Sequence, residues 1–200
     1  MIRILLLLFL LLTNSSAFAS EAIAAQLKDF SYLKAKFIQE RQLSNPSITL
    51  RSTGKLLLSP KDGLWWQQEE PFGMTLLLTD TSMLQQLEGE AAQPLAAGGN
   101  AQMQQFQRLL RDLLVVDLQA LNQHFSLTSL PTETTGWKLK LEPKTSPLNQ
   151  LFAYFELTGD QVVRRLIMKD NKGDSTTIRF SLQQLSHTPL TEDERAVFYP

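Results

Sequence analysis

Few side chains in this chain of 200 residues could perform acid–base or nucleophilic chemistry, and those few are dispersed. There are two histidines, His124 and His187, and no cysteine. The G-x-S-x-G pattern of a serine nucleophile and the H-E-x-x-H pattern of a zinc site are both absent from the sequence. Carboxylates occur singly or as neighbours such as Glu69-Glu70, which is typical of a solvated face. We therefore expect a protein that is not an enzyme, with no catalytic residues, no metal ligands and no cofactor.

One tripeptide, Gly173-Asp174-Ser175, is similar to the nucleophile block of some lipid hydrolases. The leucine expected after that serine is Thr176 here. Glycine, aspartate and serine are also the residues that tight turns favour, so we interpret the tripeptide as a hairpin turn. A hydrolase of lipid esters that uses Ser175 and His187 is kept as a third hypothesis.

The charge balance and the missing cysteine restrict the partners. The sequence contains nineteen Lys and Arg and twenty Asp and Glu, which gives a formal net charge of -1. Binding to a phosphate backbone needs a basic field, so we predict no nucleic-acid partner. Without cysteine the chain can form neither disulfides nor thiolates, and it cannot itself be anchored through a thioether-linked lipid.

Residues 1–19 have the pattern of a secretory signal peptide. Arg3 gives a positive start, Ile4–Leu12 is an uninterrupted apolar run, and Ala17-Phe18-Ala19 is a small-x-small cleavage site. A transmembrane helix needs about 20 apolar residues, so this run is too short to be one. We expect cleavage of this segment and one domain over residues 20–200, a length that suits a single core.

The remaining chain has the periodicity of an antiparallel sheet with two main helices. Apolar residues at three-to-four spacing predict one helix within Ala22–Leu33 and another over Met103–Leu114. Alternating residues separated by turn-forming residues predict about ten strands. These are Phe37–Leu43, Ile48–Leu58, Gly63–Gln68, Met74–Thr79, Ser82–Leu87, His124–Leu130, Trp137–Leu141, Phe152–Leu157, Val162–Met168 and Thr176–Leu182.

A meander of that length must curl or close, because open twisted sheets rarely exceed about ten strands. We predict an α+β fold, mainly antiparallel β, that forms a barrel or part-barrel with helices at its mouth or on its inner face. A surface loop over Gly89–Asn100 interrupts the strands. A short helix over Thr191–Val197 ends the chain, with Thr191 as its N-cap and Glu194 as the reciprocal capping residue.

Two strands are apolar at consecutive positions, Leu56-Leu57-Leu58 and Leu76-Leu77-Leu78, so both of their faces are apolar. Such strands must be covered on both sides, by a helix on one and by core or ligand on the other. Ordinary core is the alternative for each residue. Because Leu and Met repack around different ligands, we list candidates for acyl-chain contact: Leu56, Leu58, Trp65, Trp66, Met74, Leu76, Leu78, Met83, Met103, Phe106 and Leu110.

In the order and spacing of its residues the chain resembles the periplasmic outer-membrane lipoprotein carrier family, the LolA-like proteins. No single block is specific, and the resemblance covers essentially the whole mature chain. It begins with a helix, and its positions are Phe37-Ile38-Gln39, Gly54, Leu56, Trp66, Pro71, Asp80, Leu84, Trp137–Lys144, Phe155-Glu156-Leu157, Val163–Met168 and Ile178–Leu182.

The resemblance implies an unclosed antiparallel barrel whose concave apolar face lies under a helical lid and shelters acyl chains. It further implies a soluble periplasmic carrier, expected to be a monomer. Such a carrier takes lipoproteins from an inner-membrane release complex to an outer-membrane acceptor. The related acceptor is itself lipid-anchored, so the missing cysteine favours the carrier. The alternative is a lipid-sensing or adaptor domain that binds an envelope partner without shuttling cargo.

Several positions depart from the family pattern. The family typically has an Arg-Pro pair in the turn after Gly54, where this chain has Ser59-Pro60-Lys61. In familiar carriers that arginine is associated with holding the lid and tuning release. Thr81 stands where the family favours glycine, and Gln85 and Leu87 stand where aromatic residues are common. These departures indicate a divergent branch, whose cargo could be another hydrophobic molecule such as a lipid or an acylated pigment precursor.

Overall fold

The computed structural model describes residues 21–95, 109–132 and 135–199. One 11-stranded sheet organises them, and every neighbouring pair of its strands is antiparallel. The strands are β1 (Tyr32–Ser44), β2 (Ser47–Ser59), β3 (Gly63–Glu70), β4 (Met74–Leu78), β5 (Met83–Leu87), β6 (Gln93–Pro94), β7 (Phe125–Leu130), β8 (Trp137–Pro143), β9 (Phe152–Gly159), β10 (Val163–Asp170) and β11 (Ser175–Ser186).

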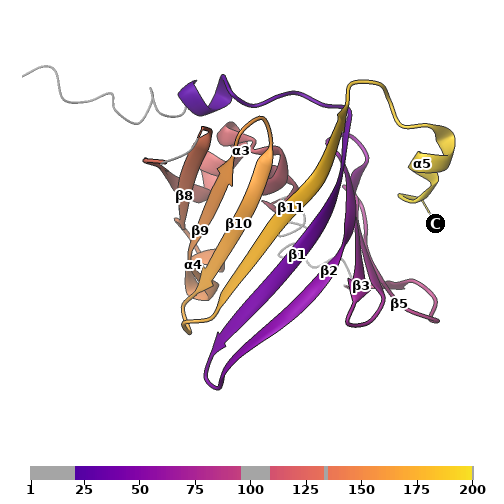
Figure 1. The fold of residues 1–200 in the computed structure, drawn as a ribbon, viewed down its shortest axis with the longest axis horizontal. Helices are drawn as coiled ribbons and strands as arrows, with labels where there is room; N and C mark the ends of the chain where they lie inside the picture. Colours follow the sequence, from indigo (N-terminus) through magenta and orange to yellow (C-terminus); the bar gives the residue numbers. More distant parts are fainter. Residues whose placement is uncertain (1–20, 96–108, 133–134, 200) are drawn as a thin grey trace, which may run out of the picture.

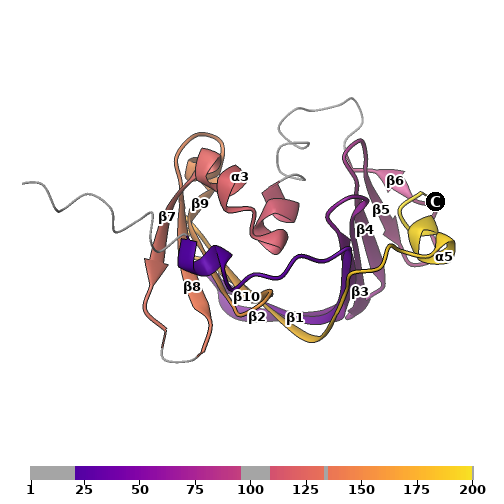
Figure 2. The same cartoon turned by 90° about the horizontal axis from the view of Figure 1, so that it is seen from above.

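The sheet is strongly curved and does not close. Its strand order is β6-β5-β4-β3-β2-β1-β11-β10-β9-β8-β7, so the strands meander outward from the central pair β1 and β11 to two separate edges. Figure 2 shows the two halves of the sheet rising on either side of its concave face, which is here called the trough. This unclosed barrel confirms the expected fold class.

The described helices are short and lie on different sides of the sheet. Residues 109–115 are helical and are followed by α3 (Leu118–His124), and both lie inside the trough (Figure 2). The helix α4 (Leu148–Leu151) precedes β9, and α5 (Glu192–Ala196) lies on the outer side of the sheet beside β3 and β5 (Figure 1). Asp117 caps α3 by accepting a hydrogen bond from the Ala120 amide at 2.9 Å.

Period-two alternation located each of the ten expected strands, with boundaries that differ by a few residues. The first expected helix is wrong beyond its opening turn, because only residues 21–24 are helical. Lys28 instead donates its amide to the Gln161 carbonyl at 2.9 Å, and Leu33 pairs with Leu58 in β2. Tertiary pairing therefore overrides a local helical pattern in this segment. The sequence also did not predict β6, α3 or α4.

Two apolar cores, one on each face of the sheet, explain the doubly apolar strands. On the concave side, Leu56 and Leu58 join a large core that includes Leu113 of the helix at residues 109–115, here named the trough helix. On the convex side, Leu57 and Leu77 pack with residues of the C-terminal segment, Leu190, Val197 and Phe198. The expectation that these strands need a cover on both sides is confirmed.

The C-terminal segment is fixed to the convex side by polar contacts as well. Thr191 and Glu194 form the predicted capping box of α5. The Glu194 carboxylate also accepts a 2.5 Å hydrogen bond from the Lys34 ammonium on β1. The Lys34 bond, followed by the hydrogen bonds from Thr191, lowers the pKa of Glu194 to about 2. The charged form of this carboxyl is therefore favoured by folding.

This network predicts a pH dependence for the folded state. A carboxyl with a lowered folded pKa stabilises the protein above its unfolded value of 4.5, and that contribution is lost as pH falls towards about 2. The free energy of unfolding should therefore fall more steeply over that range in the parent protein than in Glu194→Gln. Denaturant titrations at stepped pH, followed by tryptophan fluorescence, measure both slopes.

The matched control is Glu192→Gln, which removes a carboxylate from the same helix but outside the capping box. Its slope should equal that of the parent protein. Equal slopes for the parent and Glu194→Gln would contradict the role of the Lys34 contact.

Candidate functional site

The candidate site is the concave apolar face of β2 to β5. Antiparallel register aligns its side chains in two rows that cross these strands. One row is Leu56, Trp66 and Leu76, and the other is Leu58, Leu64, Leu78 and Met83. The residues on β2 are buried, whereas Trp66, Leu76 and Met83 are only partly buried against the core. Accessible apolar surface is therefore concentrated on β3, β4 and β5.

An aromatic stack forms the floor beneath these rows. The Trp66 ring lies on the Phe37 ring of β1, with centroids 3.8 Å apart and an angle of 26° between the planes. The Phe180 ring of β11 meets Trp66 edge-on at 6.3 Å. Gly54 makes room for this stack, since a Cβ atom there would lie 2.7 Å from the Phe37 ring and 2.0 Å from the Gln67 carbonyl oxygen.

The structure separates some of the residues that the sequence grouped together. Trp65 lies on the convex face, where it packs in the second core with Leu77 and Leu84. A site on the concave face would therefore include Trp66 and exclude Trp65. Met74 is one row further along β4, where its sulfur accepts a 3.1 Å hydrogen bond from the side-chain amide of Gln85.

The trough helix brings its own apolar side chains onto the concave face. Leu109, Leu113 and Leu114 are buried in the concave core, and the candidate Leu110 is partly buried against it. The other two candidates from this region, Met103 and Phe106, lie outside the described residues. Within the described residues, then, the helix fills part of the trough that a ligand would occupy.

An ion pair joins this helix to the sheet. The Arg111 guanidinium contacts the Asp80 carboxylate in the turn between β4 and β5. The Asp80 side chain is 65% exposed and that of Arg111 is 24% exposed, so the pair is a weak, surface-type interaction. In the sequence, Asp80 stands out only as a position of the family resemblance. Thirty-one residues separate it from Arg111, so no local pattern could have paired the two.

The turn between β2 and β3, where the family typically has an arginine, faces the C-terminal segment instead. Ser59 is buried and donates to the Asp62 carboxylate at 2.8 Å, and the Asp62 amide donates back to its hydroxyl at 3.0 Å. The other oxygen of Asp62 lies 3.4 Å from Nε of Arg195 in α5. This turn therefore helps to anchor α5 on the convex side.

The residues nominated for hydrolysis lie far apart. Ser175 begins β11 and His187 follows its last residue, so the 12-residue strand separates them by roughly 40 Å. Gly173 and Asp174 form the predicted turn, in which the Asp174 amide donates to the Asp170 carboxylate at 2.8 Å. The described residues contain no group of three or more His, Cys, Asp or Glu that could hold a metal ion.

A known protein family matches most of the chain. The family model described as "Outer membrane lipoprotein carrier protein LolA" matches residues 28–193. No curated protein matches the sequence.

Several solved structures are similar in three dimensions. A LolA superfamily protein from Nitrosomonas europaea is 12% identical with a TM-score of 0.47, over 90% of this chain and 99% of that one. A putative outer membrane lipoprotein-sorting protein domain from Vibrio parahaemolyticus is 12% identical with a TM-score of 0.45, over 90% and 97%. The MucA/MucB complex of Pseudomonas aeruginosa gives 16% identity and a TM-score of 0.49, over 89% of this chain and 60% of that one.

The aromatic floor predicts a strict requirement for glycine at position 54. Gly54→Ala would push a methyl group into the Phe37 ring and the Gln67 carbonyl, and we expect a loss of about 1–3 kcal/mol in the free energy of unfolding. Arg51→Ala on the same strand is exposed and should change the stability little. Urea denaturation monitored by tryptophan fluorescence compares them, and a Gly54→Ala protein as stable as the parent would refute the packing requirement.

Proposed function

The chain belongs to the LolA family of outer membrane lipoprotein carrier proteins, and we propose that it shelters acyl chains on its concave face and carries them between the membranes of the cell envelope. The observation that supports this most directly is the partly buried apolar surface of Trp66, Leu76 and Met83 beneath the trough helix. Each methylene group that leaves water for such a surface contributes about 0.8 kcal/mol. An acyl chain crossing an aqueous compartment needs a shelter of this kind.

We further propose that residues 1–19 direct export to the periplasm and that residues 20–200 are the carrier. The leader lies outside the described residues, and its tripartite pattern is the support for this step. Within the described part of the chain, no helix is long and apolar enough to cross a bilayer. The expected donor and acceptor, a release complex in the inner membrane and a receptor in the outer membrane, follow from family membership alone.

The trough helix is the proposed lid, and the Arg111–Asp80 pair is its proposed latch. An acyl chain that enters the trough must displace Leu109, Leu110 or Leu113 from the concave core. A buried pair would resist this movement strongly, whereas an exposed pair contributes about 0.2–1 kcal/mol. A weak latch suits a carrier that must release its cargo as well as hold it.

Acyl binding on the concave face predicts different behaviour for two adjacent tryptophans. A spin-labelled fatty acid bound in the trough should quench Trp66, which faces it, and spare Trp65 on the opposite face. Quenching should therefore fall sharply in Trp66→Phe and persist in Trp65→Phe. Fluorescence titration of the three proteins measures this quenching. Trp137 of the concave core contributes to the fluorescence signal of all three proteins. A loss of quenching in Trp65→Phe alone would place the ligand on the wrong face for this proposal.

The carrier and the adaptor hypotheses predict different rates of transfer of acylated molecules between membranes. A carrier should accelerate the movement of a fluorescent acylated peptide from donor to acceptor vesicles in proportion to its concentration. An adaptor would bind an envelope partner and leave that rate unchanged. Mass spectrometry of protein isolated from the native envelope would identify the cargo, and an empty protein that also fails to transfer the peptide would contradict the carrier role.

The latch predicts a change in acyl affinity when either charge is removed. Arg111→Gln should free the trough helix and raise the affinity for a fluorescent fatty acid by up to about fivefold, since the exposed pair is worth no more than about 1 kcal/mol. The charge-swapped protein Asp80→Arg/Arg111→Asp should return to the parent affinity. Arg164→Gln on β10, which removes an ion pair with Asp160 in the preceding turn, is the matched control. The same increase in that control would assign the effect to net charge and refute the latch.

A further inference from the structure

The convex face of β3, β4 and β5 contains two adjoining pockets that acyl binding on the concave face leaves unused. The first, of about 210 Å³, is mainly apolar and is lined by Trp65, Leu77, Leu84 and Val197 together with Thr75 and Gln86. The second, of about 390 Å³, is polar, and its lining includes Gln67, Glu69, Thr75, Gln86 and Glu88. Gln68, Met74 and Leu87, which alternate with these residues along the strands, also contribute atoms to its lining. Thr75 and Gln86 belong to both, so the two pockets form one continuous depression, here named the convex groove.

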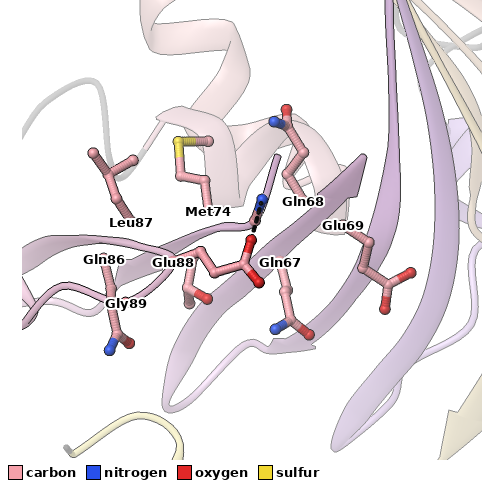
Figure 3. Close-up of a pocket in the computed structure, with 10 residues that line it drawn as sticks. Gln67, Gln68, Glu69, Met74, Gln86, Leu87, Glu88 and Gly89 are labelled. Atoms are coloured by element: carbon pink, nitrogen blue, oxygen red, sulfur yellow. Dashed lines mark hydrogen bonds between the residues drawn. The ribbon is translucent and has the colours of Figure 1, made fainter. Parts of the chain in front are cut away.

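The strand register explains why one end of the convex groove is apolar and the other polar. Trp65, Leu77 and Leu84 form one row across the three strands, and Gln67, Thr75 and Gln86 form the next. Figure 3 shows Gln67 and Gln86 pointing to the opposite side from Met74 and Leu87, which belong to the concave face. The side chains of Gln67, Thr75 and Gln86 in the convex groove therefore lie on the opposite face of the sheet from those of the trough.

The polar end is suited to a cation that donates hydrogen bonds. It contains the carboxylates of Glu69 and Glu88 and the amide side chains of two glutamines. Lys55 neutralises Glu69 in part, at 3.2 Å. Glu88 accepts only a long 3.4 Å hydrogen bond from the Gly73 amide and has no cationic partner within the described residues (Figure 3). Two carboxylates attract a lysine or arginine and disfavour a phosphate or carboxylate group.

The apolar end has the size of one side chain. Pockets for small molecules usually measure about 300–1,000 Å³, so this end alone is too small for such a ligand. Trp65 and Glu69 are four residues apart on β3, which separates the apolar end from the carboxylates by roughly 13 Å. This spacing equals the distance between side chains i and i+4 of an extended peptide. The convex groove thus offers an apolar and an acidic subsite in the register of a peptide strand.

We propose that the convex groove binds an extended segment of a partner protein that places one apolar side chain beside Val197 and a lysine or arginine between Glu69 and Glu88. The proposal does not depend on what the trough carries. Because the two sites lie on opposite faces of the sheet, a partner bound in the convex groove leaves the concave face free to exchange cargo.

The test uses the full mature chain and synthetic peptides with blocked ends. The probe peptide has one leucine and one lysine four positions apart among serines and threonines. Two matched peptides replace the lysine with glutamate or the leucine with serine. Fluorescence anisotropy measures affinity at low and at physiological salt, and amide chemical shifts show where the peptide binds. The protein variants are Glu69→Gln/Glu88→Gln and, as control, Glu142→Gln on β8.

The lysine–leucine peptide should shift the amide signals of Gln67, Thr75 and Gln86, and its affinity should fall as salt rises. The double variant should bind up to about tenfold more weakly, with less dependence on salt, while the control matches the parent. Both altered peptides should bind more weakly as well. Equal binding by the double variant would overturn the proposal, as would shifts confined to the concave face. Equal binding of the serine-substituted peptide would also overturn it, because the apolar subsite would then play no part.

Discussion

A sheet that is apolar on both faces must be covered on both faces, and the arrangement of this molecule follows from that constraint. Consecutive leucines in β2 and β4 place apolar side chains on the concave and convex sides at once. The helix at residues 109–115 covers the concave side, and the C-terminal segment around α5 covers the convex side. The two covers come from distant parts of the chain, and each removes apolar surface of the sheet from water.

The two covers differ in how firmly they are held. The C-terminal segment combines buried Leu190 and Phe198 with a capping box, an ion pair to Lys34 and another to Asp62. The described part of the trough helix is held by its apolar residues and by an exposed ion pair to Asp80. The cover on the convex side is therefore held by more polar contacts than the described part of the cover on the concave side. This difference supports the concave cover as the movable one and the convex cover as a permanent part of the fold.

Local pattern predicted the strands well because alternation is a property of each segment alone. It failed where the outcome depended on residues far away in the chain. The apolar stripe around Phe30 suits a helix equally well, but hydrogen bonds to Gln161 and Ser186 hold that segment extended. Alternation also showed that Trp65 and Trp66 face opposite ways, without showing which of them faces the trough. That assignment required the pairing of β3 with β2 and the position of α5.

The open edges of the sheet have a consequence for the range of cargo that the proposed carrier can hold. In a closed barrel the strand number and stagger determine the radius, so the interior cannot widen without breaking backbone hydrogen bonds. Among the described strands, β6 and β7 are the two ends of a single curved ribbon, and β6 is a two-residue edge containing Pro94, which discourages pairing with another chain. The curvature of the ribbon can relax by small changes of twist spread over many strands. A thicker or a thinner bundle of hydrocarbon can then be enclosed by the same hydrogen-bonded sheet.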